Sequence, residues 1–186
     1  MKSPRLLVLL LALPLGCQSS PSNAPAMLEP PVDNVLKLMD ERLALMHDVA
    51  VHKTTLNLPT ADATREEAIL QAVEVDAKGA NVDKAFAREF FAAQFAAAKL
   101  EQEAVRARID MPPPTDEDMK AAGKKLEEVR TKINDVSEKL LRALGKIDWA
   151  NRDAEARKLF AERGPPALER YAEAVRAKAL GPVMPR

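Results

Sequence analysis

The sequence has little of what small proteins commonly use to build metal, redox or nucleotide sites. Its 186 residues include one cysteine, six glycines, one tryptophan and one tyrosine. A single cysteine excludes an intrachain disulfide, and His47 and His52, five residues apart, have a poor helical spacing for shared metal ligands. The 28 basic and 28 acidic residues balance formally. Because no basic stripe or aromatic platform accompanies them, we expect no nucleic-acid surface.

The N-terminus has the pattern of an export signal. Lys2 and Arg5 precede residues 6–15, an apolar run interrupted only by Pro14. A helix needs roughly 20 apolar residues to span a bilayer, whereas this run has the length of a signal-peptide core. We therefore expect residues 1–17 to be a signal peptide and the protein to be exported, either periplasmic or secreted.

Cys17 ends the segment "LPLGC", which resembles a bacterial lipoprotein box, although Pro14 stands where Leu is expected. Two alternatives stay open, namely lipidation of Cys17 and its removal with the signal. Residues 18–31 are rich in Ser, Pro and Ala and are expected to form a flexible tether. A lipid on Cys17 would be the only contact with a membrane, and residues 32–186 would form the folded domain.

The rest of the chain has the composition of an all-α protein. Ala, Leu, Lys, Glu and Arg dominate, and Pro falls mostly between periodic stretches. About 155 residues are enough for one domain with its own core. Apolar periodicity and helix-end signals predict a bundle of about six helices, three of them long. The expected ranges are 33–56, 62–79, 81–108, 115–144, 152–162 and 166–179.

Helix-start signals support three of these ranges. The second helix is expected to start at Asp62 or at Thr64, and Thr64 and Glu67 have the spacing of a capping box. Thr115 and Asp118 have the same spacing at the start of the fourth. The last helix is expected to begin through the two prolines at 165–166, because proline is favoured in a first helical turn.

Two cations interrupt the apolar face of the first expected helix. Arg42 and Lys53 are eleven residues apart. At 100° per residue they lie within about 20° of each other around the helix and about 16 Å apart along it. Leu38, Met46 and other apolar residues share that face. Since an unpaired buried cation is costly, each one needs a partner inside the bundle.

Polar residues also interrupt or border the apolar faces of other expected helices. Gln102 shares a face with Phe95, Arg65 and Glu66 adjoin the apolar face of the second helix, and Arg130 borders that of the fourth. Each has a structural alternative. Arg65 and Glu66 suit a solvated first turn, Gln102 a core hydrogen bond, and Arg130 a surface salt bridge. Helical pattern alone does not choose between a shared cavity and these separate roles.

Three segments carry a family pattern, "ERLALMHDVAVHK", "NLPTADATREEAIL" and "FFAAQFAAAKLEQ". Together they resemble chorismate mutases of the all-helical class, specifically the exported subgroup with a single-chain active site. The resemblance covers residues 33 to about 109 and extends more weakly through "VRTKINDVSEKLL". The motif spacing is kept, with eleven residues from Arg42 to Lys53, twelve to Arg65 and thirty-seven to Gln102.

The resemblance implies an activity, the unimolecular rearrangement of chorismate to prephenate, which needs no cofactor or metal. It implies four catalytic residues. Lys53 and Gln102 would hydrogen-bond the ether oxygen as the bond breaks, Arg42 would hold a carboxylate in fork geometry, and Glu66 would receive the ring hydroxyl.

The resemblance also implies substrate-binding residues around these four. Asp62 lies near Glu66, Arg65 adds to the positive field, and Lys99 lines the mouth. Cytoplasmic members of the class take a further arginine from the partner chain, at a place that corresponds to Pro25 here. Exported members take it from their own later helix, where Arg130 stands, so the site is expected within one chain.

Two further interpretations compete with an enzyme. One is a binding or regulatory protein on the same fold, which the complete charged set disfavours. The other is a structural envelope lipoprotein, which predicts cations on solvated faces. A monomer and a homodimer are both compatible with a site inside one chain. Residues 145–186 resemble the exported subgroup only in helical character, so their role stays open.

Overall fold

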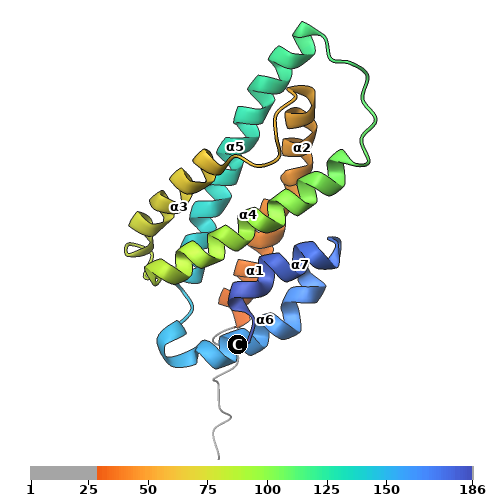
Figure 1. The fold of residues 1–186 in the computed structure, drawn as a ribbon. Coiled ribbons are helices and arrows are strands. Elements are labelled where there is room, and N and C mark those ends of the chain that lie inside the picture. Colours follow the sequence, from red (N-terminus) through yellow and green to blue (C-terminus); the bar gives the residue numbers. More distant parts are fainter. Residues whose placement is uncertain (1–28, 186) are drawn as a thin grey trace, which may run out of the picture.

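All regular structure in residues 29–185, which are the residues described by the computed structural model, is helical (Figure 1). The predicted all-α class is confirmed. The predicted signal peptide, Cys17 and most of the predicted tether lie outside the described residues. The elements are α1 (Glu29–Ala44), α2 (Met46–Thr55), α3 (Ala63–Ala77), α4 (Lys84–Arg106), α5 (Asp116–Leu144), α6 (Trp149–Ala167), α7 (Glu173–Leu180) and a 3₁₀ helix, η2 (Gly181–Val183).

The first expected helix is divided in two and begins earlier than predicted. Leu45 separates α1 from α2, although its φ and ψ stay helical at −70° and −13°. Helix α1 starts at Glu29, inside the predicted tether, with two prolines in its first turn. The first N–H groups of a helix have no partner within it, so proline loses nothing there.

Asp62, rather than a Thr64–Glu67 capping box, begins α3. Its Oδ1 accepts a hydrogen bond from the backbone N–H of Arg65 at 3.1 Å, which satisfies a free donor of the first turn. Glu67 instead pairs with Arg88 across the α3–α4 contact, at 2.7 Å. The capping-box prediction was therefore wrong for α3. The capping box predicted at the start of α5, from Thr115 and Asp118, is confirmed.

The C-terminal helices differ from their predicted bounds. Helix α6 spans Trp149–Ala167, and the prolines at 165–166 lie in its last turn instead of leading into α7. Each proline removes one N–H from the helical ladder, and α6 ends directly after them. Helix α7 begins only at Glu173.

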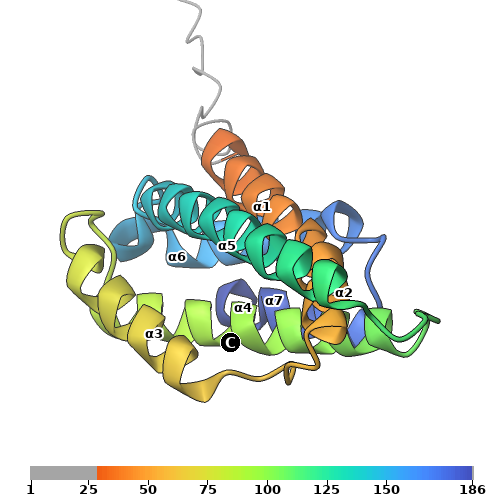
Figure 2. The same ribbon diagram turned by 90° about the horizontal axis from the view of Figure 1, so that it is seen from above.

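Helix α4 is the central contact of the bundle. It packs against α2, α3 and α7, while α5 packs against α1 and α2, and α6 against α1. Viewed from above, α5 crosses over one side of the bundle and α4 runs along the other, with α3 beside one half of α4 (Figure 2). Among residues 29–185, no helix has the length and apolar character needed to cross a membrane.

The core is apolar except for a few buried polar side chains. Its largest buried members include Phe90, Phe91, Phe160 and Met39. Against this background the buried polar residues are conspicuous, and three of the six are Arg42, Lys53 and Gln102. The predicted placement of the two cations within the apolar face of the first helix pair is therefore confirmed.

Candidate active site

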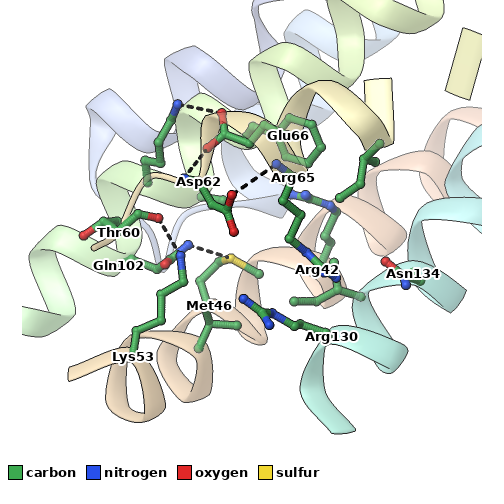
Figure 3. A pocket seen from close by; sticks show the side chains of 16 residues that line it. Arg42, Met46, Lys53, Thr60, Asp62, Arg65, Glu66, Gln102, Arg130 and Asn134 are labelled. Atoms are coloured by element: carbon green, nitrogen blue, oxygen red, sulfur yellow. Dashed lines mark hydrogen bonds and ion pairs between the residues drawn. The ribbon is translucent and has the colours of Figure 1, made fainter. Parts of the chain in front are cut away.

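A pocket lies between α1, α2, α3, α4 and α5, and it contains every side chain predicted for the site (Figure 3). It encloses about 610 Å³ of empty space, part of which is open to solvent. The predicted residues that line it are Arg42, Lys53, Asp62, Arg65, Glu66, Lys99, Gln102 and Arg130.

Arg42 is held at the back of the pocket without a counter-ion. Its side chain is 2% exposed. Nη1 donates to the carbonyl of Gln94 at 3.2 Å, Nε donates to Oγ of Ser137 at 3.4 Å, and the guanidinium lies 5.3 Å from the ring centroid of Phe95. No carboxylate of residues 29–185 forms an ion pair with it. Burial lowers the pKa of Arg42 to about 10, so the group stays charged at neutral pH and favours an anionic ligand.

Lys53 is fixed by a single acceptor. Its ammonium donates to the carbonyl oxygen of Thr60 at 2.6 Å, and the residue is 7% exposed. Burial lowers its pKa, and the positive charges of Arg130 and Arg106 lower it further, against the nearby carboxylates. An ammonium has three N–H donors. Within the described chain two of them remain available to a ligand.

Gln102 is buried with its hydrogen-bonding capacity largely unused. Its Nε2 donates only to Sδ of Met46, at 3.5 Å, and a thioether is a weak acceptor. Its Oε1 has no hydrogen-bond partner in the described residues. Because its only acceptor is a weak one, the Gln102 Nε2 group can donate to a ligand oxygen that enters the pocket.

The carboxylates lie at the opposite wall, at the start of α3. Glu66 Oε2 accepts a hydrogen bond from Lys99 Nζ at 2.9 Å, and its Oε1 accepts one from the backbone N–H of Asp62 at 3.4 Å. Asp62 in turn caps the helix through Arg65 N–H. Both carboxyl groups are therefore held in place by the helix start, within reach of the pocket.

Two further arginines complete the positive lining. Arg130, on α5, forms an ion pair with Glu127 on its own helix and also lines the pocket. The salt-bridge alternative and the pocket placement therefore both hold for Arg130. Arg65, on α3, lines the pocket and forms no ion pair with the described residues. Arg65 does lie in the first turn of α3, as its structural alternative predicted, but it also lines the pocket.

Two polar pocket residues were missed from sequence. Thr60 acts on Lys53 through its backbone carbonyl, for which a side-chain pattern gives no signal. Asn134 lies four residues after Arg130 on α5, a spacing that places both on one helix face and would have identified it. The apolar walls are formed by Met46, Val49, Ile69, Phe95, Ala98 and Ile133.

The lining suits a small organic dianion. It carries five cations and two carboxylates, and its side-chain donors in the described residues are Arg, Lys and amide groups and the Thr60 hydroxyl. In residues 29–185 no serine outside the Arg42 contact, no cysteine and no histidine reaches this pocket. No cluster of His, Cys, Asp and Glu in the described chain has the arrangement of a metal site. The arrangement can bind carboxylates and donate hydrogen bonds to a buried oxygen.

Residues 33–103 match the family model described as "Chorismate mutase type II". The fold is similar to that of a chorismate mutase from Burkholderia thailandensis, at 29% identity over 82% of this chain and 98% of that one, with a TM-score of 0.64. It is also similar to a chorismate mutase from Burkholderia phymatum, at 18% identity over 86% and 99% of the chains, with a TM-score of 0.67. A comparison with curated proteins gives no match.

Proposed function

We propose that this protein is a chorismate mutase, an isomerase that converts chorismate to prephenate. The predicted activity agrees with the family match over residues 33–103 and with both structural neighbours. The observation that carries the proposal is the convergence of Arg42, Lys53 and Gln102 in one pocket, all buried and all with unused binding capacity.

The reaction requires no group to be transferred to the protein. Chorismate rearranges within one molecule as an ether bond breaks and a carbon–carbon bond forms, so the protein has to hold the compact conformer and stabilise developing charge. A millionfold acceleration corresponds to about 8 kcal/mol of transition-state stabilisation. Fixed donors in a largely buried pocket are suited to supply much of that energy.

The donors have distinct proposed roles. Lys53 and Gln102 donate to the ether oxygen, where negative charge grows as the bond breaks. Their position at the buried end of the pocket, each with free N–H groups, supports this role. Arg42 binds one carboxylate of the substrate, which provides the counter-ion that it lacks within the described chain.

The remaining residues are proposed to place the substrate around that oxygen. Arg130 binds the second carboxylate, and Arg65 adds to the positive field. Glu66, which Lys99 and the start of α3 hold in place, accepts a hydrogen bond from the ring hydroxyl, with Asp62 nearby. Lys99 lines the mouth.

Turnover of chorismate by the purified protein tests the proposal. We expect ultraviolet absorbance to show chorismate loss and prephenate formation. Lys53→Ala should lower kcat about a hundredfold, because loss of one charge-stabilising donor costs roughly 3 kcal/mol. Lys124→Ala, at an exposed position of α5, is the control and should leave kcat unchanged. Absence of turnover by the wild type would favour a binding protein on the same fold.

We also propose that the protein is exported and acts outside the cytoplasm. The apolar run at residues 6–15 and the segment before Cys17 support this proposal. Cell fractionation with Cys17→Ser tests it. Release of this variant from a membrane fraction would indicate lipidation, and unchanged soluble export of both forms would indicate cleavage of the signal without a lipid.

A further inference from the structure

The loop between α2 and α3 is tied to the end of α4 by one side chain. Arg106, the last residue of α4, donates from Nη1 to the carbonyl of Leu58 at 3.0 Å and to the hydroxyl of Thr60 at 3.2 Å. Both acceptors belong to the loop. Arg106 forms no ion pair with the described residues, so these loop contacts are its hydrogen bonds within that part of the chain.

The same loop holds the ammonium of Lys53. The carbonyl of Thr60 accepts the Lys53 bond at 2.6 Å, while the hydroxyl of Thr60 accepts from Arg106. The other end of the loop folds back onto α2, where the Leu58 N–H donates to the Lys53 carbonyl at 2.8 Å and Asn57 adopts a positive φ of 52°. Thr60 therefore contacts two cations, Lys53 through its backbone carbonyl and Arg106 through its side-chain hydroxyl.

We propose that Arg106 is a positioning residue for the reaction, which fixes Thr60 so that its carbonyl directs the Lys53 ammonium into the pocket. This inference rests on the proposed function. Arg106 does not line the pocket, so it acts through the loop and touches no substrate.

The chemistry of lysine gives this contact its importance. A lysine ammonium is a compact charge on a flexible four-carbon stem, and a misplacement of about 1 Å can cost a hundredfold in rate. The carbonyl of Thr60 is the acceptor that defines the position of Lys53 in the described chain. The position of a backbone carbonyl in a loop depends on the conformation of that loop. Arg106 fixes this loop to α4 through its hydrogen bonds to Leu58 and Thr60.

Electrostatics alone does not account for this placement. The charge of Arg106 opposes that of Lys53 and disfavours its protonated form. A neutral donor at residue 106 would avoid that repulsion. Both hydrogen bonds to the loop come from Nη1, and they give a specific reason for a long side chain with more than one N–H group at this place.

Steady-state kinetics on Arg106 and Thr60 variants tests the proposal. Arg106→Met and Thr60→Val should each lower kcat about tenfold, with KM changed less than twofold. Thr60→Ser, which keeps the hydroxyl, should retain most of the activity. Arg108→Met is the matched control, because Arg108 lies two residues after the end of α4 and its side chain donates to the carbonyl of Ala104 on α4, away from the loop. It should leave kcat unchanged.

Two combined variants separate positioning from loss of stability. The Arg106→Met, Thr60→Val double variant should lose no more kcat than Arg106→Met alone, because Arg106→Met already removes the contact with the Thr60 hydroxyl. In a Lys53→Ala background, Arg106→Met should cause no further loss of kcat, although its effect on the melting temperature should persist.

The outcomes distinguish this inference from the proposed function. An active wild type with an unchanged kcat in Arg106→Met would overturn the role of Arg106 and leave the activity intact. An equal loss in the Lys53→Ala background would also overturn it, since Arg106 would then act independently of Lys53. A wild type without turnover would overturn the proposed function, and the role of Arg106 with it.

Discussion

At the scale of single residues, the pocket gathers groups whose charge or hydrogen bonding is incomplete within the described chain. Arg42 has no carboxylate partner, and Gln102 has an unpaired buried oxygen and only a sulfur acceptor for its amide N–H. Such groups lower the free energy of unfolding. A ligand that brings a carboxylate to Arg42 and an acceptor oxygen to the Gln102 N–H is the simplest physical reason for their presence in the core.

Part of this site was predictable at the residue scale. A cation inside an apolar helical face is an anomaly that sequence reveals, and Arg42 and Lys53 are both buried as that anomaly predicted. The position of Thr60 was not predictable. Its contact with Lys53 uses a backbone carbonyl in a turn, so any residue type is compatible with it.

Arg42→Met should make the protein inactive and more stable. The folded-state pKa of Arg42, about 10, is below its ordinary value of 12.5. The charged form is therefore disfavoured on folding at every pH below about 10, at a cost of about 3 kcal/mol. This cost falls as pH rises from 10 toward 12.5, because the folded protein then loses its proton first. We expect Met to raise the free energy of unfolding at pH 7 by about 1–3 kcal/mol, measured by urea denaturation.

Arg142→Met is the control for that substitution. Arg142 lies on the exposed face of α5, where it pairs weakly with Glu138 at 3.4 Å. Its replacement should change neither stability nor kcat/KM appreciably. Destabilisation by Arg42→Met comparable to the loss of a core side chain would show that the bonds to Gln94 and Ser137 outweigh the cost of burying the charge.

Gln102→Glu should make activity depend on pH. An amide donates at every pH, whereas a carboxyl group donates only when protonated. The wild type should show a nearly flat kcat/KM from about pH 5.5 to 8.5, because the Gln102 amide has no proton to lose in that interval. The variant should keep activity near pH 5 and lose it as pH rises. A variant profile as flat as that of the wild type would exclude Gln102 as the donor to the ether oxygen.

At the scale of helices, the sequence located most elements but not their ends. Existence and type follow from apolar periodicity, which is strong in α4 and α5. The ends depend on competing local partners. Asp62 caps α3 in place of the Thr64–Glu67 box. Its carboxylate lies three residues before Arg65 and accepts the Arg65 N–H. The prolines at 165–166 lie in the last turn of α6. Their position in the sequence is equally compatible with the first turn of the next helix.

Tertiary contacts also restrict single positions in and next to a helix, as one glycine inside α5 and the glycine that caps its C-terminal end show. A Cβ on Gly145, the C-cap residue, would lie 1.7 Å from the carbonyl oxygen of Ala80, a backbone atom in the turn after α3. A Cβ on Gly123, inside α5, would meet nothing within 4 Å. Helical periodicity predicts both to be helical or nearly so and does not distinguish them.

Gly145→Ala should therefore destabilise the protein and Gly123→Ala should stabilise it. The first substitution forces backbone to move, which should lower the free energy of unfolding by about 2 kcal/mol or more. The second removes a flexible residue from a helix interior and should raise it by about 0.5–1 kcal/mol. Thermal or urea denaturation of the pair checks both signs. Equal effects would show that the α5 end tolerates a shift away from Ala80.

At the scale of the whole molecule, the C-terminal helices support the wall that holds the site. Helix α7 packs on α4, and Gln94 on α4 donates to the carbonyl of Ala179 on α7 at 2.8 Å. The backbone carbonyl of the same Gln94 accepts a hydrogen bond from Arg42. Helix α7, in a segment for which the sequence suggested no role beyond helical character, therefore supports the helix that orients a pocket cation. Such long-range packing has no local sequence signal.

The described chain brings both proposed carboxylate-binding arginines into one pocket. Arg42 on α1 and Arg130 on α5 line the same cavity, and α1 packs directly on α5. The proposed site can therefore take its second arginine from its own chain, in a monomer or in a homodimer. Under this proposal, activity does not depend on whether the protein forms a dimer.

Mixing two inactive variants tests whether each site is built from a single chain. Arg42→Ala and Arg130→Ala should each lose activity, and mixing them after unfolding and refolding together should restore none, because every chain lacks one arginine of its own site. If arginines were exchanged between chains of a dimer, half of all dimers in the mixture would be heterodimers. Each heterodimer would contain one intact site of its two, so about a quarter of the activity would return. Refolding each variant with an equal amount of wild type is the control and should give about half the wild-type activity. Recovery in the variant mixture, together with a dimer in size-exclusion chromatography, would contradict a site within one chain.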